Sequence, residues 1–327
     1  GRLSLAANTT GTQNTAVGFC SLNANTTGAN NVAIGVQALD TNTTANENVA
    51  VGRCSLFSNT EGTKNIAIGS YSLDTNSTGD SNIAIGYQAL DANTTADNNV
   101  AVGDSALKAN TTGTNNVAVG KDALLANVSG QQNVAIGVCA LNANTGYNNV
   151  AIGYQALDAN IGGDSNVAVG LHSLLLNTTG NYNVAVGRKA LCSNTTGLTN
   201  VAIGLTALND NTEGTNNIAI GCAALLDHST GNNNVAIGVA TLFDNTTASD
   251  NTALGSYSMV KNTTGTANLA AGTNAMACNT TGAYNVAVGA NAGLLHTTGG
   301  NNIFVGDSAG RQNTTGCKNT GLGSGAL

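Results

Sequence analysis

Thirteen asparagines stand two residues before a serine or threonine, the arrangement that accepts an N-linked glycan. These candidate glycosylation sites are Asn8, Asn25, Asn42, Asn76, Asn93, Asn110, Asn127, Asn177, Asn194, Asn245, Asn262, Asn279 and Asn313. The same residues also suit a tight turn, because asparagine tolerates left-handed backbone and threonine hydrogen-bonds within its own turn. The pattern therefore predicts a row of covalent glycans on a turn, with turn formation alone as the alternative.

One short segment, Gly306 to Gly310, spells G-D-S-A-G and matches the G-x-S-x-G nucleophile elbow of serine hydrolases. Such an elbow needs a strand before the serine and a helix after it. Here Gly306 belongs to a glycine repeat that runs through the chain, and no helix is predicted after Ser308. We interpret the match as accidental.

Metal-ligating and redox residues are sparse and scattered. The three histidines, His172, His228 and His296, lie about four repeats apart, so they cannot share one ion within a chain. The aspartates Asp40, Asp74, Asp91 and Asp158 lack the glycine-rich nonapeptide that wraps calcium in other β-rolls. The seven cysteines show no pair in matching positions of adjacent repeats. We therefore expect no catalytic residue, no metal and no cofactor, and we expect that the protein is not an enzyme.

A glycine column sets the period of the chain. Glycine recurs every 17 residues from Gly1 to Gly323, with one step of 16 between Gly137 and Gly153, where the turn is shorter. Nineteen full units result. A period this short and regular is typical of a solenoid, in which each unit packs only against its neighbours.

Each unit has the alternation of a short β-strand. The example around Gly35 reads Asn31-Val32-Ala33-Ile34-Gly35, then Ala38-Leu39, then Asn42-Thr43-Thr44. Alternating β-branched residues bounded by glycine and Asn-Thr turns indicate strands and exclude helices. We predict an all-β, parallel β-solenoid (β-roll) of nineteen coils of about 17 residues, forming a single repeat domain over residues 1–327. Val32, Ile34 and Leu39 are expected to fill inner seams, with hydrogen-bonded ladders of asparagine.

The residue between the two β-branched positions should vary if it points at water, but it is alanine in seventeen of nineteen units. The exceptions are Phe304 and Gly321. This constancy predicts a second protein surface packed on that face, which a symmetric homotrimer would supply. A close internal turn is the alternative.

The Asn-Val-Ala-Ile-Gly pattern, seen at Asn31 to Gly35, Asn133 to Gly137 and Asn234 to Gly238, resembles the head repeats of trimeric autotransporter adhesins and similar repeats in phage tail fibres. The resemblance covers the whole chain. It implies a parallel β-roll on a bacterial or viral surface projection, usually trimeric and used for attachment. No catalytic residue comes with it.

Composition narrows the function further. The net charge of −7 is spread thinly with no basic cluster, which argues against a nucleic acid partner, and no apolar run is long enough for membrane insertion. The repeat is under way at Gly1 and still running at Leu327, so we expect any signal, cap or anchor to lie outside these residues. We expect an extracellular or cell- or virion-surface location.

The expected function is a structural component of an extracellular fibre or stalk, with the chain itself as partner. Assembly would be lateral, as a homotrimer, or end to end as a filament, because open coil edges invite another strand. An adhesin or receptor-binding head is the first alternative, although the exposed variable residues such as Val36, Ser70 and Asp104 form no patch. An ice-binding protein is the second alternative. Adjacent threonines such as Thr43 and Thr44 point to opposite sides, however, leaving only one threonine file.

Overall fold

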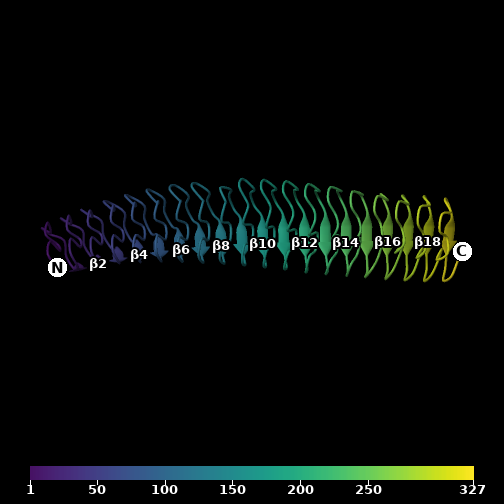
Figure 1. The fold of residues 1–327 in the computed structure, drawn as a ribbon, viewed down its shortest axis with the longest axis horizontal. Coiled ribbons are helices and arrows are strands. Elements are labelled where there is room, and N and C mark those ends of the chain that lie inside the picture. The colour runs from purple at the N-terminus through teal and green to yellow at the C-terminus, as the bar shows by residue number, and fades with distance from the viewer. The chain divides into compact units, whose positions relative to one another are not determined.

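The computed structural model describes residues 1–327 and confirms an all-β, parallel β-solenoid with about 17 residues per coil and no helix. Contacts divide the chain into two compact units, Gly1–Asp164 and Ser165–Leu327. Figure 1 shows the stacked coils of the first unit in purple to teal and those of the second in green to yellow.

Every coil contributes one strand of three residues. The N-terminal unit contains β1 (Thr15–Val17), β2 (Val32–Ile34), β3 (Val49–Val51), β4 (Ile66–Ile68), β5 (Ile83–Ile85), β6 (Val100–Val102), β7 (Val117–Val119), β8 (Val134–Ile136) and β9 (Val150–Ile152). The C-terminal unit contains β10 (Val167–Val169), β11 (Val184–Val186), β12 (Val201–Ile203), β13 (Ile218–Ile220), β14 (Val235–Ile237), β15 (Thr252–Leu254), β16 (Leu269–Ala271), β17 (Val286–Val288), β18 (Ile303–Val305) and β19 (Thr320–Leu322).

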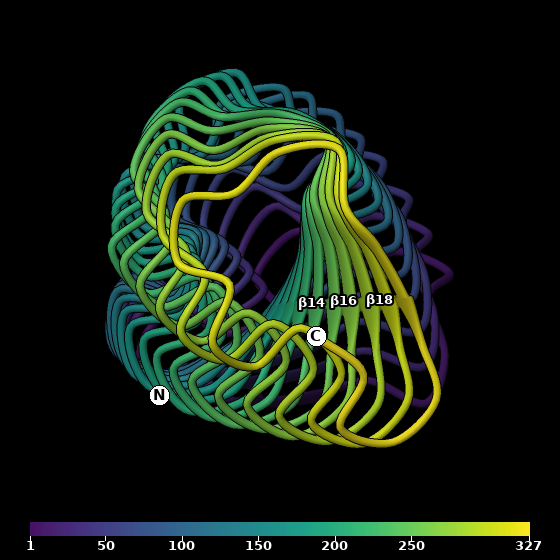
Figure 2. The same ribbon diagram turned by 90° about the vertical axis from the view of Figure 1, so that its right-hand side faces the viewer.

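Within each unit the strands of successive coils pair in parallel and in strict register. In the N-terminal unit Ile83 pairs with Val100 and Ala84 with Ala101. Equivalent residues of the repeat therefore form straight columns along the stack. Figure 2 looks along the stack of the C-terminal unit and shows β14, β16 and β18 on one side of the coil, with a zigzag of turns closing the rest of it.

The repeat glycine is required by the close approach of neighbouring coils. Gly86 has φ +139°, a region that other residues rarely adopt, and an added Cβ would lie 2.3 Å from the carbonyl oxygen of Gly103 in the next coil. That oxygen is backbone and cannot move aside. The constant glycine column thus fixes the point where each coil turns away from its strand.

The segment after the glycine turns through left-handed residues that are not glycine. Gln88 and Leu90 have φ of 51° and 53°, and the residues at these two repeat positions share this conformation in almost every coil. The backbone amide of Gln88 donates to the Ser70 carbonyl of the preceding coil at 3.1 Å. The backbone amide of Leu90 donates to the Ala106 carbonyl of the following coil at 3.0 Å. A left-handed leucine costs roughly 1–2 kcal/mol, and burial of its side chain offsets that cost.

The apolar core of each coil is small. The leucines of this column from Leu22 to Leu242 are completely buried, as are Ala84 in the strand and Ala89 before Leu90. The predicted leucine seam is therefore confirmed.

Candidate interaction surface

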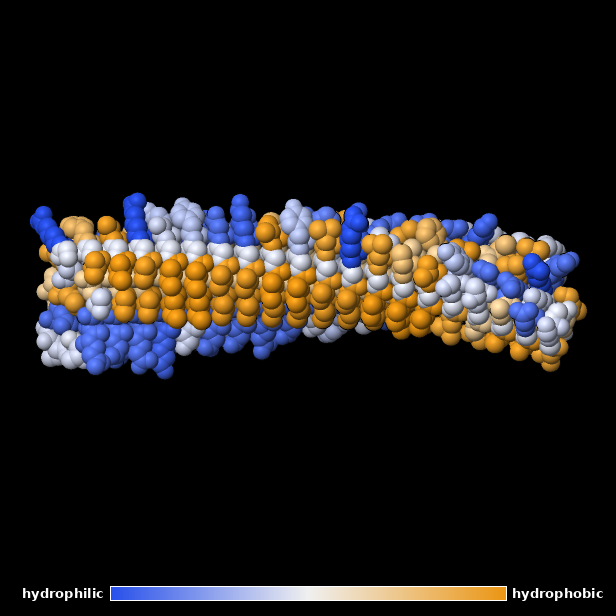
Figure 3. Space-filling view, turned by 90° about the horizontal axis from the view of Figure 1, so that it is seen from below, coloured by the Kyte–Doolittle hydropathy of each residue, from blue (hydrophilic) through white to orange (hydrophobic).

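The first and third residues of each strand point outward, and together they form a surface that we call the strand face. In β2 these residues are Val32, which is half-buried, and Ile34, which is 40% exposed. Figure 3 shows the apolar residues as an orange band along the stacked coils. The prediction that valine and isoleucine fill an inner seam is wrong, because these side chains face solvent.

The strand alanine, such as Ala33, lies inside and is fully buried. This residue must be small because it faces the leucine of its own coil. The coil of Phe304 demonstrates this, because an added Cβ at Gly310, which stands in the leucine column, would lie 2.2 Å from the Phe304 ring. The inward strand position thus faces the leucine position, and both cannot be large. The alanine constraint is internal, so it no longer argues for a partner protein on that side.

Two buried asparagine columns stitch each coil to its neighbours. Asn42, in the turn, donates from Nδ2 to the Asn25 side-chain oxygen at 2.9 Å and to the Ala45 carbonyl at 3.1 Å. Asn31, before the strand, donates to the same Ala45 carbonyl at 2.9 Å, and its Oδ1 accepts from the backbone amide of Asn48. The predicted asparagine ladders are confirmed.

The turn asparagines that carry the glycan motif are therefore inside the coil. Eleven of the thirteen candidate sites are fully buried, among them Asn42, Asn110 and Asn262. Their Nδ2 atoms, to which a sugar would attach, are occupied by hydrogen bonds. A glycan has no outlet to solvent there, so the folded coil leaves room for one only at Asn8, which is exposed, and Asn313, which is half-buried.

Two histidines, His228 and His296, stand at the turn position that asparagine occupies in the other coils. The 17-residue period alone identifies both of them as replacements for asparagine. His228 is buried, and its Nε2 lies 2.8 Å from the Gly231 carbonyl while its Nδ1 lies 3.0 Å from Asn245 Nδ2. A neutral ring with its proton on Nε2 satisfies both contacts, donating to Gly231 and accepting from Asn245. Burial lowers the pKa of His228, although the carbonyls of Gly231 and Asn245 partly oppose that effect.

A histidine ring with one N–H cannot do all that an asparagine amide does. An amide donates both to its own coil and to the preceding asparagine, whereas the two histidine rings contact carbonyls of their own and of the following coil and make no hydrogen bond to the preceding asparagine. The oxygen of the preceding asparagine is left without a partner at both places, namely Asn211 Oδ1 before His228 and Asn279 Oδ1 before His296. Asn127 Oδ1 is orphaned for a different reason, since the next coil is the shortened one and Asn144 donates elsewhere.

The remaining titratable candidates do not converge. The structure has no group of three or more histidine, cysteine, aspartate or glutamate residues that could hold a metal ion, and all seven cysteines are free thiols. Asp74 and Asp91 lie in adjacent coils at the same repeat position. Burial, with a smaller contribution from the Asp91 charge, raises the pKa of Asp74 to about 6. Asp74 Oδ1 has no hydrogen-bond partner.

The serine of the G-D-S-A-G segment lies at a left-handed corner, with φ 56° at Ser308, and no helix follows it. Its hydroxyl lies 3.3 Å from a carboxylate oxygen of the adjacent Asp307. The sequence match thus reflects the repeat glycine and the glycine that accommodates Phe304.

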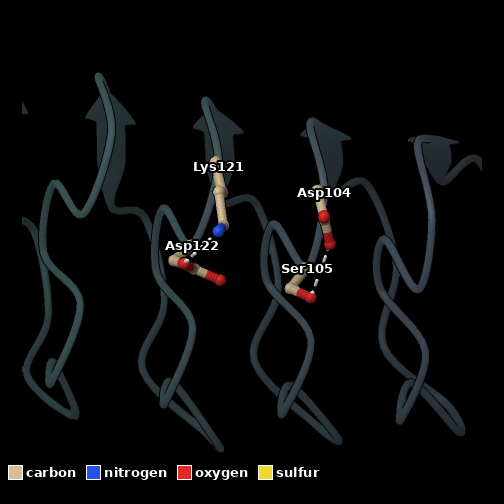
Figure 4. A network of polar contacts seen from close by, with 4 residues as sticks. All are labelled: Asp104, Ser105, Lys121 and Asp122. Atoms are coloured by element: carbon tan, nitrogen blue, oxygen red, sulfur yellow. Dashed lines mark hydrogen bonds and ion pairs between the residues drawn. The ribbon is translucent and has the colours of Figure 1, made fainter.

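The two variable residues after the repeat glycine form the corner surface. The first residue is exposed or half-exposed, with Asp104 and Lys121 among the exposed ones, and the second is half-buried in almost every coil. Figure 4 shows Ser105 donating to Asp104 at 2.9 Å and Lys121 paired with Asp122 at 3.9 Å. Each of these two interactions lies within one coil. Because the residues at these two positions change along the chain, the surface differs from coil to coil.

The two threonines of the turn have different environments. The Thr43 hydroxyl donates to the Thr60 carbonyl of the next coil at 3.4 Å, whereas Thr44 is exposed. One file of exposed threonines results, as the sequence predicted for the ice-binding alternative.

A scan with models of protein families gives no match, and a search of curated protein sequences also gives none. The structure holds no helix with the length and hydropathy needed to cross a membrane.

Proposed function

We propose that this chain is a structural component of an extracellular fibre or stalk that assembles with copies of itself. The observation that carries the proposal is the repeated hydrogen bonding between neighbouring coils. Strand, corner and turn each bond to neighbouring coils, as with Val100 donating to Asn116 at 2.8 Å and Asn93 donating to Asn76 at 2.8 Å. Such a stack suits a scaffold, and its variable surface shows no convergent polar cluster of the kind that catalysis needs.

The test combines location with shape. Antibodies against the chain should label intact source cells or virions without permeabilisation, and electron micrographs should show the label on projections. Label that appears only after permeabilisation would reject the extracellular part of the proposal. Isolated protein that binds cells or matrix glycans saturably would favour an adhesin instead.

One observation favours the adhesin as a second candidate. The Arg53 guanidinium lies 5.4 Å above the Tyr71 ring, and the Tyr71 and Tyr87 rings meet edge to face at 6.3 Å. Aromatic clusters with a cation are common in recognition sites. Under this alternative, Tyr87→Ala would abolish binding to cells. The ice-binding alternative has less support, since only one threonine file is exposed, and a thermal-hysteresis assay checks it.

A further inference from the structure

We infer that the strand face is an interface at which two copies of this chain pair face to face about a two-fold axis. The inference deepens the proposed structural role and rests on it.

The strand face is suited to burial because it lacks charge. No strand contains aspartate, glutamate, lysine or arginine, and the outward positions are almost entirely valine, isoleucine or leucine. The columns beside it are different. Glu47 and Lys64 stand on the asparagine side, and Arg53 and Lys121 stand on the glycine side. An apolar centre with a polar border is the usual arrangement of a protein interface.

The size of the strand face fits a specific contact. In the N-terminal unit the third strand residues alone form a file of nine side chains, several of them near 40% exposed, with a half-buried file beside them. Together they offer on the order of several hundred Å² in that unit, comparable with the ~800 Å² that each partner buries in a standard interface. A lone protein rarely exposes a contiguous apolar patch of this size without a function for it.

The partner must match a ladder that repeats once per coil. Stacked strands are spaced about 4.8 Å apart, and outward residues of adjacent coils lie in strict register. A surface with the same spacing can interdigitate along its whole length, and a second copy of this chain has that spacing by construction. A partner without this repeat would meet only a few side chains at a time.

The symmetry follows from the shape of the face. Figure 3 shows the band over the N-terminal unit without a hollow. When an open sheet face packs against the identical face of another copy, the contact is isologous and the assembly closes as a dimer. In a trimer three flat strand faces around one axis would meet each other only near their edges, where the neighbouring columns carry charged and polar residues. The geometry therefore favours a dimer over the trimer that the alanine pattern had suggested.

The coil supplies matched positions for a test. Ile34, Ile136 and Ile237 lie on the strand face and are each 40% exposed. Two residues later in the same coils, Val36, Val138 and Val239 lie on the corner surface and are 45%, 42% and 44% exposed. Lysine at the first set charges the strand face, and lysine at the second set adds the same charge at equal exposure outside it.

The experiment measures the mass of the full chain by sedimentation with a reducing agent present, because the seven thiols are free. Wild type should have twice the 32.3 kDa mass of one chain. The triple variant Ile34→Lys, Ile136→Lys, Ile237→Lys should raise the dissociation constant by at least ~100-fold, since it would bury unpaired charge. The triple variant Val36→Lys, Val138→Lys, Val239→Lys should remain dimeric, and circular dichroism should show both variants folded.

A gentler variant covers the case in which the lysine chain does not fold. Threonine already occupies outward strand positions at Thr15 and Thr252, so threonine at Ile34, Ile136 and Ile237 should fold and still weaken the dimer. A monomeric or trimeric wild type, or equal effects of the strand-face and corner variants, would overturn the interface. A trimeric wild type or equal effects of the variants would leave the fibre proposal standing. A monomeric wild type would leave only its extracellular scaffold role, which the antibody labelling tests. Saturable cell binding by the monomeric variant would overturn the fibre proposal and leave the interface standing.

Discussion

At the turn of each coil, a single asparagine side chain makes the hydrogen bonds that water would make to the backbone of a solvated loop. Its amide nitrogen serves the carbonyl of its own turn and the asparagine of the preceding coil, and its oxygen accepts from the following one. Buried polar groups of this kind are favourable only when every member is satisfied. The places where the column breaks are therefore the places where single substitutions should have measurable effects.

Replacing His228 with asparagine should raise the free energy of unfolding by about 1 kcal/mol at pH 7, because the new amide can donate to the orphaned Asn211 Oδ1. The change should also reduce acid sensitivity. Because the pKa of His228 is lowered in the folded state, the unfolded chain takes up a proton first as the pH falls below about 6.5. Stability carried by the neutral ring is thus complete above that pH and declines below it.

Urea unfolding followed by circular dichroism at pH 7.5 and pH 5.5 measures both effects. The converse substitution, Asn194→His, is the control, since it places a ring in an intact stretch of the column. It should lower stability and add acid sensitivity. An unchanged pH dependence in His228→Asn would show that the ring is not what titrates.

Replacing Asp74 with asparagine should stabilise the chain at neutral pH. The carboxyl has a pKa raised from 3.8 to about 6, first by burial and then by Asp91. The unfolded chain therefore ionises first as the pH rises from about 4 to 6, so this group lowers stability across that window. Partial exposure reduces the effect to about 1 kcal/mol at pH 7. Asparagine already occupies this repeat position at Asn23 and Asn142.

The measurement for Asp74→Asn is the same unfolding experiment at pH 7.5 and pH 4. The gain should be present at pH 7.5 and absent at pH 4, where Asp74 is protonated in the folded chain. A gain of equal size at both values would mean that the charge is not its source.

At the scale of the strand, the sequence predicted the element and its pairing but not the direction of its side chains. Three residues of alternating pattern, such as Val32-Ala33-Ile34, have two possible orientations, and the bulkier residues were expected inside. The observed orientation follows from the corner, because the buried Leu39 occupies the interior and leaves room only for a methyl group opposite. The signal was the constancy of the alanine, which distinguishes a tight core position from an interchangeable outer one. Left-handed leucine, which is rare, gave no such signal.

The coil of β18 can show whether the inward strand residue and the leucine position share one space in the core. Phe304 stands at the inward strand position, and Gly310 stands where most other coils have leucine. Phe304→Ala alone should cost about 3–5 kcal/mol through the cavity that it leaves. Gly310→Leu alone should also destabilise, because its side chain would overlap the phenylalanine ring. The double variant restores the regular alanine and leucine pair and should recover most of the loss.

A double-mutant cycle from urea unfolding gives the coupling between these two positions. The φ of 62° at Gly310 is close to that of the leucines in this column, so the backbone should accept leucine. Additive losses in the double variant would show that the two positions do not share one space.

At the scale of the whole chain, each coil contacts mainly its two neighbours within a unit, so stability should grow with the number of coils. The period of 17 and the parallel stacking could be predicted because each repeat position has the same packing environment in every coil and therefore keeps the same type of residue. The division into two compact units could not, since the repeat runs through Asp164 and Ser165 without a break in its pattern.

Removing one whole coil should therefore be tolerated where removing half a coil is not. Deleting the 17 residues Ile66–Asn82 joins Asn65 to Ile83 and keeps every column in register. At the usual stability per residue this should cost about 1–3 kcal/mol. Deleting the nine residues Ile66–Asp74 instead places polar turn residues at strand and core positions, and the loss should exceed ~5 kcal/mol. Urea unfolding of both chains, followed by circular dichroism, provides the comparison. Equal losses would mean that the coil is not the unit of stability, whereas a small loss confined to the 17-residue deletion would establish that coils can be removed singly from this scaffold.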